Sequence, residues 1–386
     1  MKTNEDQDVV SVSQFFRDLE DPRCHVNRKH LLGDILVICI CAVVSGADGP
    51  LAIGAWARSK KDWLHTVLEL PHGIPSHDTI GRVLATLKPS AFQACFEKWT
   101  AAFQASSSST DVDSATHIAI DGKALRGSYD KRRGFDPLFL ISAWSVRCGI
   151  SLGQLAIPNK TSEITAIPEL LGHLDLTRAI VTIDAAGCQK NIAKQIVDQG
   201  GDYLLALKGN QRNIYKATQE FVEKALGQKD LLESSQRYEV SEQKHGRADT
   251  YQYLQLQAPS TLKDGEKWTG LQTIGVAVRT SEQHGKVTRD IRYFLSSLPV
   301  GISNFVQGVR GHWAIENTLH WCLDVTFRED ESRLRNRIAG DNIAWLRRFA
   351  IGLIKQNTSK HSVAMRRRMA GWNEQFLAQL LGISMA

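Results

Sequence analysis

The chain has 386 residues, of which 42% are hydrophobic and 23% charged, and its formal net charge is +6. These values are typical of a soluble globular protein with two or three domains. The seven cysteines are scattered and lack the paired spacing of a zinc site or a disulfide framework. The longest apolar run, Ile35 to Val44, is shorter than the roughly 20 residues of a membrane span, and the polar N-terminus does not resemble a signal peptide. We therefore expect a reduced, cytoplasmic protein.

The first hundred residues have the pattern of helices. Apolar residues recur at helical spacing, and Ser76 stands where it is able to cap the N-terminus of a helix. Helices are expected over 31–47, 52–68, 79–87 and from Pro89 onward. The polar run Ser106 to Thr110 is interpreted as a linker. We therefore expect a helical N-terminal accessory domain at residues 1–105.

A different pattern follows the linker, because short apolar strands now alternate with helices. Strands are expected at 117–120, 138–146, 149–157, 179–183 and 203–207, and helices at 163–174 and 189–198. The order β-β-β-α-β-α-β indicates a mixed sheet flanked by helices. We therefore assign residues 111–209 to the first part of an α/β core.

The rest of the chain divides into two further segments. Residues 210–298 start with a polar helix and continue with alternating strands such as Thr250 to Leu256, so they are interpreted as a mostly β insertion. Residues 299–386 are mostly helical and are expected to complete the core. They are also basic, since ten Lys or Arg and three acids follow from Glu331 to the end.

Two parts of this basic segment carry clustered arginines. In the helix after Asn342 we expect an apolar face, from which Arg347 and Arg348 point away. The run Arg366 to Arg368 is interpreted as a solvated surface. It also suits contact with a nucleic acid backbone.

Two strands lead into an aspartate. An Ile-Ala-Ile sequence precedes Asp121 and a Val-Thr-Ile sequence precedes Asp184, and a glycine follows each within three residues. In α/β proteins, ligands bind where buried strands end. A turn explains either aspartate alone, but two at equivalent positions indicate a site. Neighbouring carboxylates repel each other unless a cation lies between them, and Mg²⁺ prefers such oxygen ligands.

A third acid comes from the segment Gly308 to Asp324. On a helix, His312, Glu316 and His320 share one face. An apolar face, which is able to pack on the sheet, lies beside them and consists of Ile315, Leu319 and Cys322. The alternative is a solvated helix that happens to carry a glutamate.

These motifs resemble those of a known family. The order strand-Asp121, strand-Asp184, β insertion and helix-Glu316 is similar to the ribonuclease H-like core of DDE transposases. More closely, several segments resemble the insertion-sequence transposases that include the H-repeat-associated proteins: 120–123, 182–189, 205–210, 245–247 and 312–317. Gly73 to Thr79 resembles the accessory domain of the same group. The resemblance covers essentially the whole chain.

The resemblance implies an α/β fold: a ribonuclease H-like mixed sheet core with an all-β insertion and a helical N-terminal domain that recognises DNA ends. It implies a DNA transposase whose Asp121, Asp184 and Glu316 hold two Mg²⁺ or Mn²⁺ ions. Such an enzyme cleaves the ends of an insertion sequence and joins the freed 3′-hydroxyl to target DNA. The implied partners are DNA and at least one further copy of the chain, with neither a membrane nor a small-molecule substrate.

The chain departs from the signature of the broader superfamily, in which Tyr, Arg and Lys accompany the third acid at set spacing. These spacings fall here on other residue types: Val309, His312 and Leu323. Arg310, His320 and Asp324 lie nearby and are candidates for phosphate contact or positioning. We therefore expect His312, His320 and Asp324 to support the site.

DNA chemistry needs cations that contact phosphates. Lys123 and Arg126 follow the first aspartate, and Lys208 follows the strand beside the second. Ion pairs with the site carboxylates are an equal alternative for these three residues. His245 and Arg247 lie between two strands, where a hairpin tip either inserts toward DNA or forms a plain polar turn.

Two rival functions share these features. One is a catalytically silent relative that only binds DNA, for example as a repressor. The other is a ribonuclease H-like nuclease that cleaves DNA without strand transfer. Three convergent carboxylates argue against the first, and only the accessory regions argue against the second.

Overall fold

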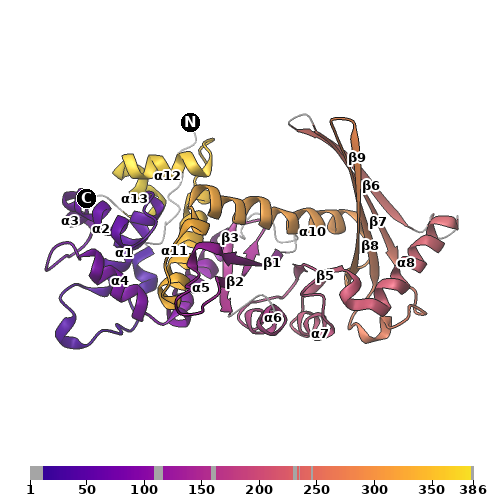
Figure 1. Ribbon diagram of the computed structural model, residues 1–386, viewed down its shortest axis with the longest axis horizontal. Coiled ribbons are helices and arrows are strands. Elements are labelled where there is room, and N and C mark those ends of the chain that lie inside the picture. The colour runs from indigo at the N-terminus through magenta and orange to yellow at the C-terminus, as the bar shows by residue number, and fades with distance from the viewer. Residues whose placement is uncertain are drawn as a thin grey trace.

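A computed structural model of the chain describes residues 12–107, 116–157, 162–228, 233, 235–244 and 247–383. The molecule is elongated, with the helices of its N-terminal and C-terminal regions at one end and the long strands β6–β9 at the other (Figure 1). Within the described residues, nine strands form a single sheet. None of the helices in this part of the chain has the length and apolar character that crossing a membrane requires.

The N-terminal region is helical, as its sequence predicts. Ser76 caps α4 by accepting a hydrogen bond from the Thr79 N–H at 3.2 Å. The segment 52–68 forms two helices instead of the expected one. The helices are η1 (Val12–Phe16), η2 (His25–Asn27), α1 (Leu32–Val44), α2 (Pro50–Ser59), α3 (Lys61–Val67), α4 (His77–Thr86) and α5 (Pro89–Ser107). Because α5 extends through Ser107, it includes the start of the expected linker, and residues 108–110 lie outside the described residues.

The first five strands form a ribonuclease H-like mixed sheet in the spatial order β3-β2-β1-β4-β5. β2 pairs antiparallel with β1 and β3, while β1, β4 and β5 are parallel. The chain order β-β-β-α-β-α-β confirms the expected pattern. The elements are β1 (Thr116–Leu125), η4 (Arg126–Ser128), β2 (Leu138–Ser145), β3 (Ile150–Ile157), α6 (Glu163–Gly172), β4 (Ala179–Ile183), α7 (Lys190–Asp198) and β5 (Asp202–Leu207).

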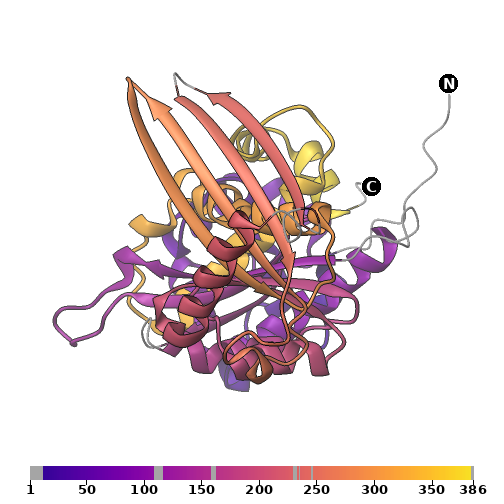
Figure 2. The same cartoon turned by 90° about the vertical axis from the view of Figure 1, so that its right-hand side faces the viewer.

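The strands of the β insertion extend this same sheet. β9 pairs antiparallel with β5, and the order continues β9-β8-β7-β6. Figure 2 shows that the outer halves of these strands project beyond the body of the molecule, and most of β9 is exposed. The elements are η6 (Gly209–Gln211), α8 (Arg212–Gly227), β6 (Gln236–Lys244), β7 (Arg247–Gln257), η7 (Gly265–Lys267), β8 (Thr273–Gln283) and β9 (Lys286–Ser296).

A long helical segment returns from the insertion across the sheet. α10 (Ile302–Ala314) continues into two π-helical stretches, η8 (Ile315–His320) and η9 (Cys322–Thr326). Gly308 and Gly311 let it approach closely, because an added Cβ would meet Leu204 at the first and collide with the His117 ring at the second. This close packing sets the position of every residue that follows on the segment.

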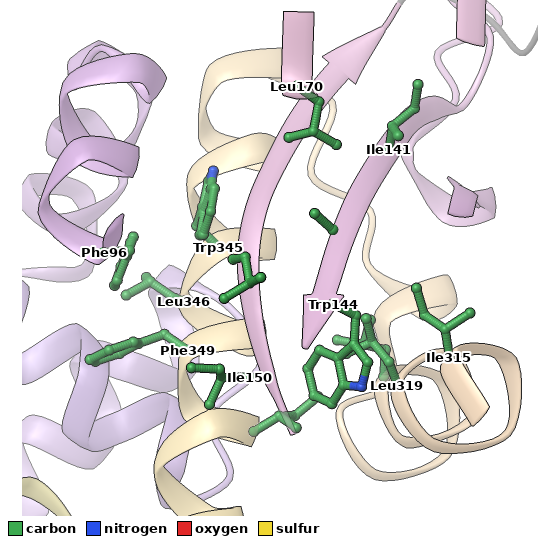
Figure 3. Packing of buried hydrophobic residues seen from close by; sticks show 14 of the residues in the cluster. Phe96, Ile141, Trp144, Ile150, Leu170, Ile315, Leu319, Trp345, Leu346 and Phe349 are labelled. Carbon is green, nitrogen blue, oxygen red and sulfur yellow. The ribbon is translucent and has the colours of Figure 1, made fainter. Parts of the chain in front are cut away.

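The apolar face expected beside Glu316 is buried, since Ile315, Leu319 and Cys322 are at most 3% exposed. Figure 3 shows Ile315 and Leu319 beside Trp144 of β2. The segment therefore packs on the sheet through this face, as the sequence predicts.

The C-terminal helices pack against both the N-terminal helices and the sheet. They are η10 (Glu329–Glu331), α11 (Arg337–Gln356), α12 (Val363–Trp372) and α13 (Glu374–Leu381). α11 packs against α1 and α4 on one side and against β3 on the other. Trp345 stacks on Phe96 of α5 with ring centroids 5.3 Å apart, and Phe349 lies beside them (Figure 3). The Asn342 side chain donates to the Leu84 and Leu87 carbonyls, both at 2.9 Å.

Arg347 and Arg348 are buried, although the sequence places them outside the apolar face of α11. They are 2% and 0% exposed. The Arg348 Nη1 lies 3.0 Å from the Glu329 Oε1, and the Arg347 Nη2 donates to the Asp48 carbonyl at 3.0 Å. They are buried because α11 is covered on more than one side, so residues outside its apolar face are enclosed as well.

The run Arg366 to Arg368 is not wholly solvated either. Arg367 is 7% exposed, donates to the Val43 carbonyl at 3.2 Å and lies 4.1 Å over the Phe327 ring. Arg366 donates to the Ile354 carbonyl at 3.1 Å, and Arg368 is exposed. Part of the basic charge of this region therefore holds helices together instead of facing a partner.

Candidate active site

Asp121 and Asp184 occupy neighbouring positions at one edge of the parallel strands. The register pairs Ile120 of β1 with Ile183 of β4, and each aspartate is the next residue. β4 ends at Ile183, as expected. β1 was expected to end before Asp121, but it continues to Leu125 because it stays paired with β2; only its pairing with β4 stops at Ile120. The two carboxylates therefore leave the sheet side by side.

Both aspartates also make local hydrogen bonds. The Asp184 Oδ1 accepts from the backbone N–H of Ala186 at 2.9 Å and of Gly187 at 3.3 Å. The Asp121 Oδ1 accepts from the Gly122 N–H at 2.8 Å. In each case these bonds use only Oδ1, and Oδ2 is available for other contacts. Asp184 is therefore able both to stabilise the turn after β4 and to take part in a site.

Three other acids influence the pKa of Asp121. Burial raises the pKa of Asp121 to about 7, and the negative charges of Asp184, Glu316 and Glu163 add to this rise. The hydrogen bond from Gly122 opposes it. The three neighbouring carboxylates are thus the second reason, after burial, why the charged form of Asp121 is disfavoured, and a bound cation would favour that form.

Glu163 was not anticipated from the sequence. It is the first residue of α6 and is 7% exposed. A Cβ added at Gly122 would collide with the Glu163 Oε1, so the missing side chain of Gly122 is what admits this carboxylate. No local signal marks Glu163, because a glutamate in the first turn of a helix is ordinary.

Glu316 lies in the π-helical stretch that follows α10, and its side chain is exposed. Such stretches are rare and occur often at functional sites. Because Ile315 and Leu319 on either side of it are buried, the backbone of Glu316 is held against the sheet while its carboxylate stays accessible. This is the environment that a ligand-binding acid needs.

His312 is part of a hydrogen-bonded group beneath this site. Its Nδ1 lies 3.2 Å from the Thr182 Oγ1, and the His117 Nε2 lies 3.0 Å from the same oxygen. Burial lowers the pKa of His312 to about 4 and that of His117 to about 4. Both rings are therefore neutral near pH 7. His312 therefore carries no positive charge there.

His320 lies between Asp121 and a buried group of charges. Its Nδ1 is 3.6 Å from the Asp121 Oδ2. Burial lowers the pKa of His320 to about 3, with the charges of Arg348 and Lys123 acting in the same direction. Within the described residues its Nε2 is buried and has no hydrogen-bond partner. His320 is thus a neutral neighbour of the first aspartate.

Lys123 is buried in ion pairs, but its partners are not the three site carboxylates that the sequence offered as the alternative to DNA contact. Its Nζ lies 2.7 Å from the Asp324 Oδ1, 2.9 Å from the Asp330 Oδ1 and 3.8 Å from the Glu329 Oε2. Glu329 is wholly buried and also contacts Arg348. We call Lys123, Asp324, Glu329, Asp330 and Arg348 the buried charge network. It connects β1 with the segment that carries Glu316.

The other expected DNA contacts lie at the surface. The Arg126 side chain is 83% exposed and its Nε is 3.4 Å from Asp330, while Lys208 is exposed. Arg247 is exposed and its Nη2 lies 2.8 Å from the Asp249 Oδ2. His245 lies outside the described residues.

Arg310 belongs to a strip of arginines and aromatic rings between α10 and the projecting strands. It forms an ion pair with Glu242, and its guanidinium lies 5.6 Å over the Tyr251 ring. Arg292 of β9, which the sequence did not single out, lies 5.1 Å over the Trp313 ring. The two rings are 5.9 Å apart. Arg292 also pairs with Asp290, its Nε lying 2.8 Å from the Asp290 Oδ2, so both guanidinium groups of the strip are already engaged by a carboxylate.

Two family models match the chain. The transposase DDE domain matches residues 113–353, and the DDE transposase-associated domain matches residues 13–100. The first match alone covers more than half of the sequence. The chain belongs to the DDE transposases.

Individual relatives agree with this assignment. This DDE transposase is 39% identical to the H repeat-associated putative transposase YhhI of Escherichia coli K12 over 361 residues, which are 92% of this chain and 93% of that protein. It is 35% identical to the putative transposase YncI of Escherichia coli O157:H7 over 97% of this chain and 95% of that one. A piggyBac transposase synaptic complex with hairpin DNA aligns with a TM-score of 0.40 at 11% identity, over 97% of this chain and 77% of that one.

The acids of this DDE transposase have the right chemistry for a hard divalent ion, since all of them offer oxygen ligands. Their mutual repulsion at Asp121 is also what such an ion relieves. In the part of the chain that the structure describes, however, no three His, Cys, Asp or Glu side chains are grouped closely enough to hold a metal ion. The carboxylates therefore share one electrostatic environment without forming a closed coordination shell.

Proposed function

We propose that this DDE transposase cleaves DNA at the ends of an insertion sequence and transfers the freed strand into target DNA. Asp121, Asp184 and Glu316 are its catalytic acids. The observation that carries the proposal is the register of β1 and β4, which sets Asp121 and Asp184 side by side. The negative charge of Glu316 also acts on Asp121, which supports the inclusion of Glu316 as the third acid.

Transposase DDE domains generally use divalent metal ions. Here Asp121, Asp184 and Glu316 would hold Mg²⁺ or Mn²⁺, in two ions as the family resemblance implies. Bound ions of this type lower the pKa of an attacking water or hydroxyl and stabilise the leaving oxygen. Asp121 and Asp184 are partly buried, whereas Glu316 is exposed.

Other side chains of the chain position these acids. His320 contacts Asp121 through Nδ1, and its neutral ring adds no charge that would compete with a cation. Thr182 holds His312 beneath Asp184. The buried charge network connects β1 to the helical segment after Glu316, and it would thereby hold Asp121 and Glu316 at a fixed distance from each other.

DNA backbone contacts are assigned to the exposed cations around the site. Arg126, Lys208 and Arg310 are exposed, and they come from three different parts of the chain. Lys123 is removed from this set because its ammonium is buried among carboxylates. A working unit of two or more chains on paired DNA ends is part of the proposal.

The proposal is tested with purified protein, labelled ends of its insertion sequence and a supercoiled target, in Mg²⁺, Mn²⁺ or EDTA. Wild type should nick the ends and form joined products only with metal. Glu316→Gln should abolish both while DNA affinity stays within about twofold, because the carboxylate serves chemistry and not backbone contact. Glu220→Gln, on the exposed face of α8, is the matched control and should behave as wild type.

Three other outcomes point elsewhere. Cleavage without joining indicates a nuclease. Salt-sensitive binding without cleavage in any metal indicates a silent relative. Undiminished cleavage by Glu316→Gln would remove Glu316 from the catalytic set.

A further inference from the structure

The positive charge of the C-terminal region is only partly available at the surface. Arg347, Arg348 and Arg367 are buried. Arg333 and Arg335, which precede α11, are exposed, and within the described residues neither forms an ion pair. One exposed part of this charge therefore lies in the segment 332–338, at the start of α11.

A second basic segment, residues 126–137, lies against the first one and connects β1 with β2. The Arg337 side chain donates to the Asp136 carbonyl, and its guanidinium lies 5.3 Å over the Phe135 ring. A Cβ added at Gly127 would lie only 2.6 Å from a carbonyl of the first segment. Two segments that are far apart in the sequence therefore form one surface.

We call residues 126–137 and 332–338 the basic surface. These two ranges contain seven Lys or Arg and two acids, a net charge of +5, while the whole chain carries +6. One of the two acids, Asp130, is buried. The basic surface thus concentrates nearly all of the surplus positive charge of the chain, and the partner that fits it is a polyanion.

Most of these cations are free to contact a ligand. Four of them are exposed and form no ion pair in the part of the chain that the structure describes: Lys131, Arg132, Arg333 and Arg335. Arg133 has one acidic neighbour, at 3.9 Å, and its side chain is still 71% exposed. The acids beside the surface are already engaged. Asp330 lies 2.9 Å from the Lys123 Nζ, and Glu331 pairs with Arg328.

The second segment folds into a short hairpin that holds its cations in place. Asp130 and Phe135 form a β-bridge, in which the backbone N–H of each donates to the carbonyl of the other at 2.9 Å. At the base of the hairpin, the buried Ser128 Oγ donates to the Leu125 carbonyl and accepts from the Leu138 N–H, both at 2.7 Å. An ordered backbone lowers the entropy that binding costs.

Two exposed aromatic rings accompany the cations and indicate the kind of polyanion. Tyr129 and Phe135 are 44% and 47% exposed. The Lys131 Nζ lies 5.8 Å over the Tyr129 ring, as the Arg337 guanidinium lies over Phe135. Cations together with exposed rings suit a nucleic acid, because the cations contact phosphates and the rings contact sugars or bases.

The basic surface begins a short distance from the first acid. Arg126 is five residues after Asp121 along β1, which corresponds to about 17 Å at about 3.3 Å per residue. One base pair extends a DNA duplex by about 3.4 Å. A duplex with a phosphate at Asp121 would therefore reach the basic surface about five base pairs away.

We propose that the basic surface binds the DNA backbone about five base pairs from the phosphate that is cleaved. The position of that phosphate rests on the proposed function. The contact itself rests on the charge, the free cations and the exposed rings of the surface. Such a contact is independent of sequence. It holds the duplex in line with Asp121 and is separate from the acids.

The first experiment measures binding in EDTA, so that cleavage plays no part. In fluorescence anisotropy, Lys131→Gln/Arg132→Gln should bind a duplex from the element end at least about fivefold more weakly than wild type. The slope of log K against log salt should fall by about 1 to 2, since each phosphate contact contributes about 0.9. Lys216→Gln/Lys224→Gln, on the exposed face of α8, removes the same charge and should match wild type.

The other segment of the basic surface gives a second pair of substitutions. Arg333→Gln/Arg335→Gln should weaken binding to a similar extent, and combining both double variants should multiply the two losses. A duplex of unrelated sequence should show the same losses, because phosphate contacts carry no sequence information. The Tm of each variant should stay within about 2 °C of wild type, since exposed, unpaired cations contribute little to stability.

Crosslinking locates the contact on the DNA. Cys24 is exposed and Cys148 partly so, and the other five cysteines are buried, so Cys24→Ser/Cys148→Ser removes the accessible thiols. In this background, an aryl azide attached through Arg132→Cys should crosslink DNA about five or more base pairs from the cleavage point. The same reagent attached through Lys224→Cys should give no crosslink.

Unchanged DNA affinity in both double variants of the basic surface would overturn the inference. If these variants also lose self-association in sedimentation, the surface contacts a second copy of the chain instead. Equal losses in the α8 control would show that only net charge matters, which also contradicts a local contact. A wild type that binds DNA through the basic surface but never cleaves it contradicts the proposed function and leaves the DNA contact standing.

Discussion

The Lys123 ammonium lies 2.7 Å from the Asp324 Oδ1, so a residue two positions after Asp121 on β1 is bonded to one eight positions after Glu316. The same ammonium lies 2.9 Å from Asp330. A single lysine thus joins the strand of the first acid to both the π-helical segment and the turn after it. Lysine is usually exposed, but here the buried Lys123 ammonium stabilises the packing of β1 against these two segments.

Replacing Lys123 should therefore destabilise the protein strongly. In Lys123→Met, the carboxylates of Asp324, Glu329 and Asp330 face one another without this cation, and breaking a buried ion pair costs about 3–5 kcal/mol. Urea unfolding measures the loss. Arg126→Gln, whose side chain is 83% exposed, should change the free energy of unfolding by less than about 0.5 kcal/mol. A loss below about 1 kcal/mol in Lys123→Met would show that the network is dispensable.

Gly122→Ala should distort the site through a steric clash. The added methyl collides with Glu163, so either the β1 backbone or α6 has to shift. We expect a loss of about 1–3 kcal/mol in stability and a large loss of cleavage. Gly209→Ala is the matched control, because nothing lies within 4 Å of its added Cβ.

A double-mutant cycle tests the cause of that loss. Adding Glu163→Ala to Gly122→Ala removes the obstructing carboxylate and should restore part of the stability. Purely additive effects of the two substitutions would contradict the collision.

Asp121 should report on metal binding without any DNA. Its folded pKa of about 7 exceeds the usual value of 3.8, so the stability linked to the protonated form is present at low pH and lost as pH rises through about 7. In EDTA at pH 8, Asp121→Asn should therefore be more stable than wild type by up to about 4 kcal/mol, at about 1.4 kcal/mol per pKa unit. Adding Mn²⁺ should raise the Tm of wild type only. An equal rise in both proteins places the metal elsewhere.

Asp341 of α11 should give a second pH dependence. Burial raises its pKa to about 6, although the Gln154 amide donates to its Oδ1 at 2.5 Å. The sign is the same as for Asp121, so its stabilising contribution is complete below about pH 4 and disappears as pH rises through about 6. Asp341→Asn should then gain up to about 3 kcal/mol over wild type at pH 8 and little at pH 4. Chemical unfolding at both pH values checks this, and parallel curves for the two proteins would contradict it.

Much of the candidate site was predictable, because its signals are local. The alternation of apolar strands and helices sets the core order, and this order predicts that the two aspartates follow matching apolar segments, although only β4 ends there. The apolar face of Ile315, Leu319 and Cys322 follows from helical spacing and is buried as expected. The placement of Asp121 next to Asp184 needed only the parallel pairing of β1 with β4.

The sequence by itself determined the elements, the family and the candidate acids, since each depends on residues close together in the chain or on motifs of a known type. Only the tertiary structure decided which charges are buried and which strands are neighbours. Arg348 is enclosed because α11 is covered on two sides, and Glu163 reaches the site because Gly122 lacks a side chain. The insertion joins the core sheet because β9 pairs with β5. Burial and strand pairing depend on contacts between segments that are far apart in the sequence, and local sequence patterns do not predict such contacts.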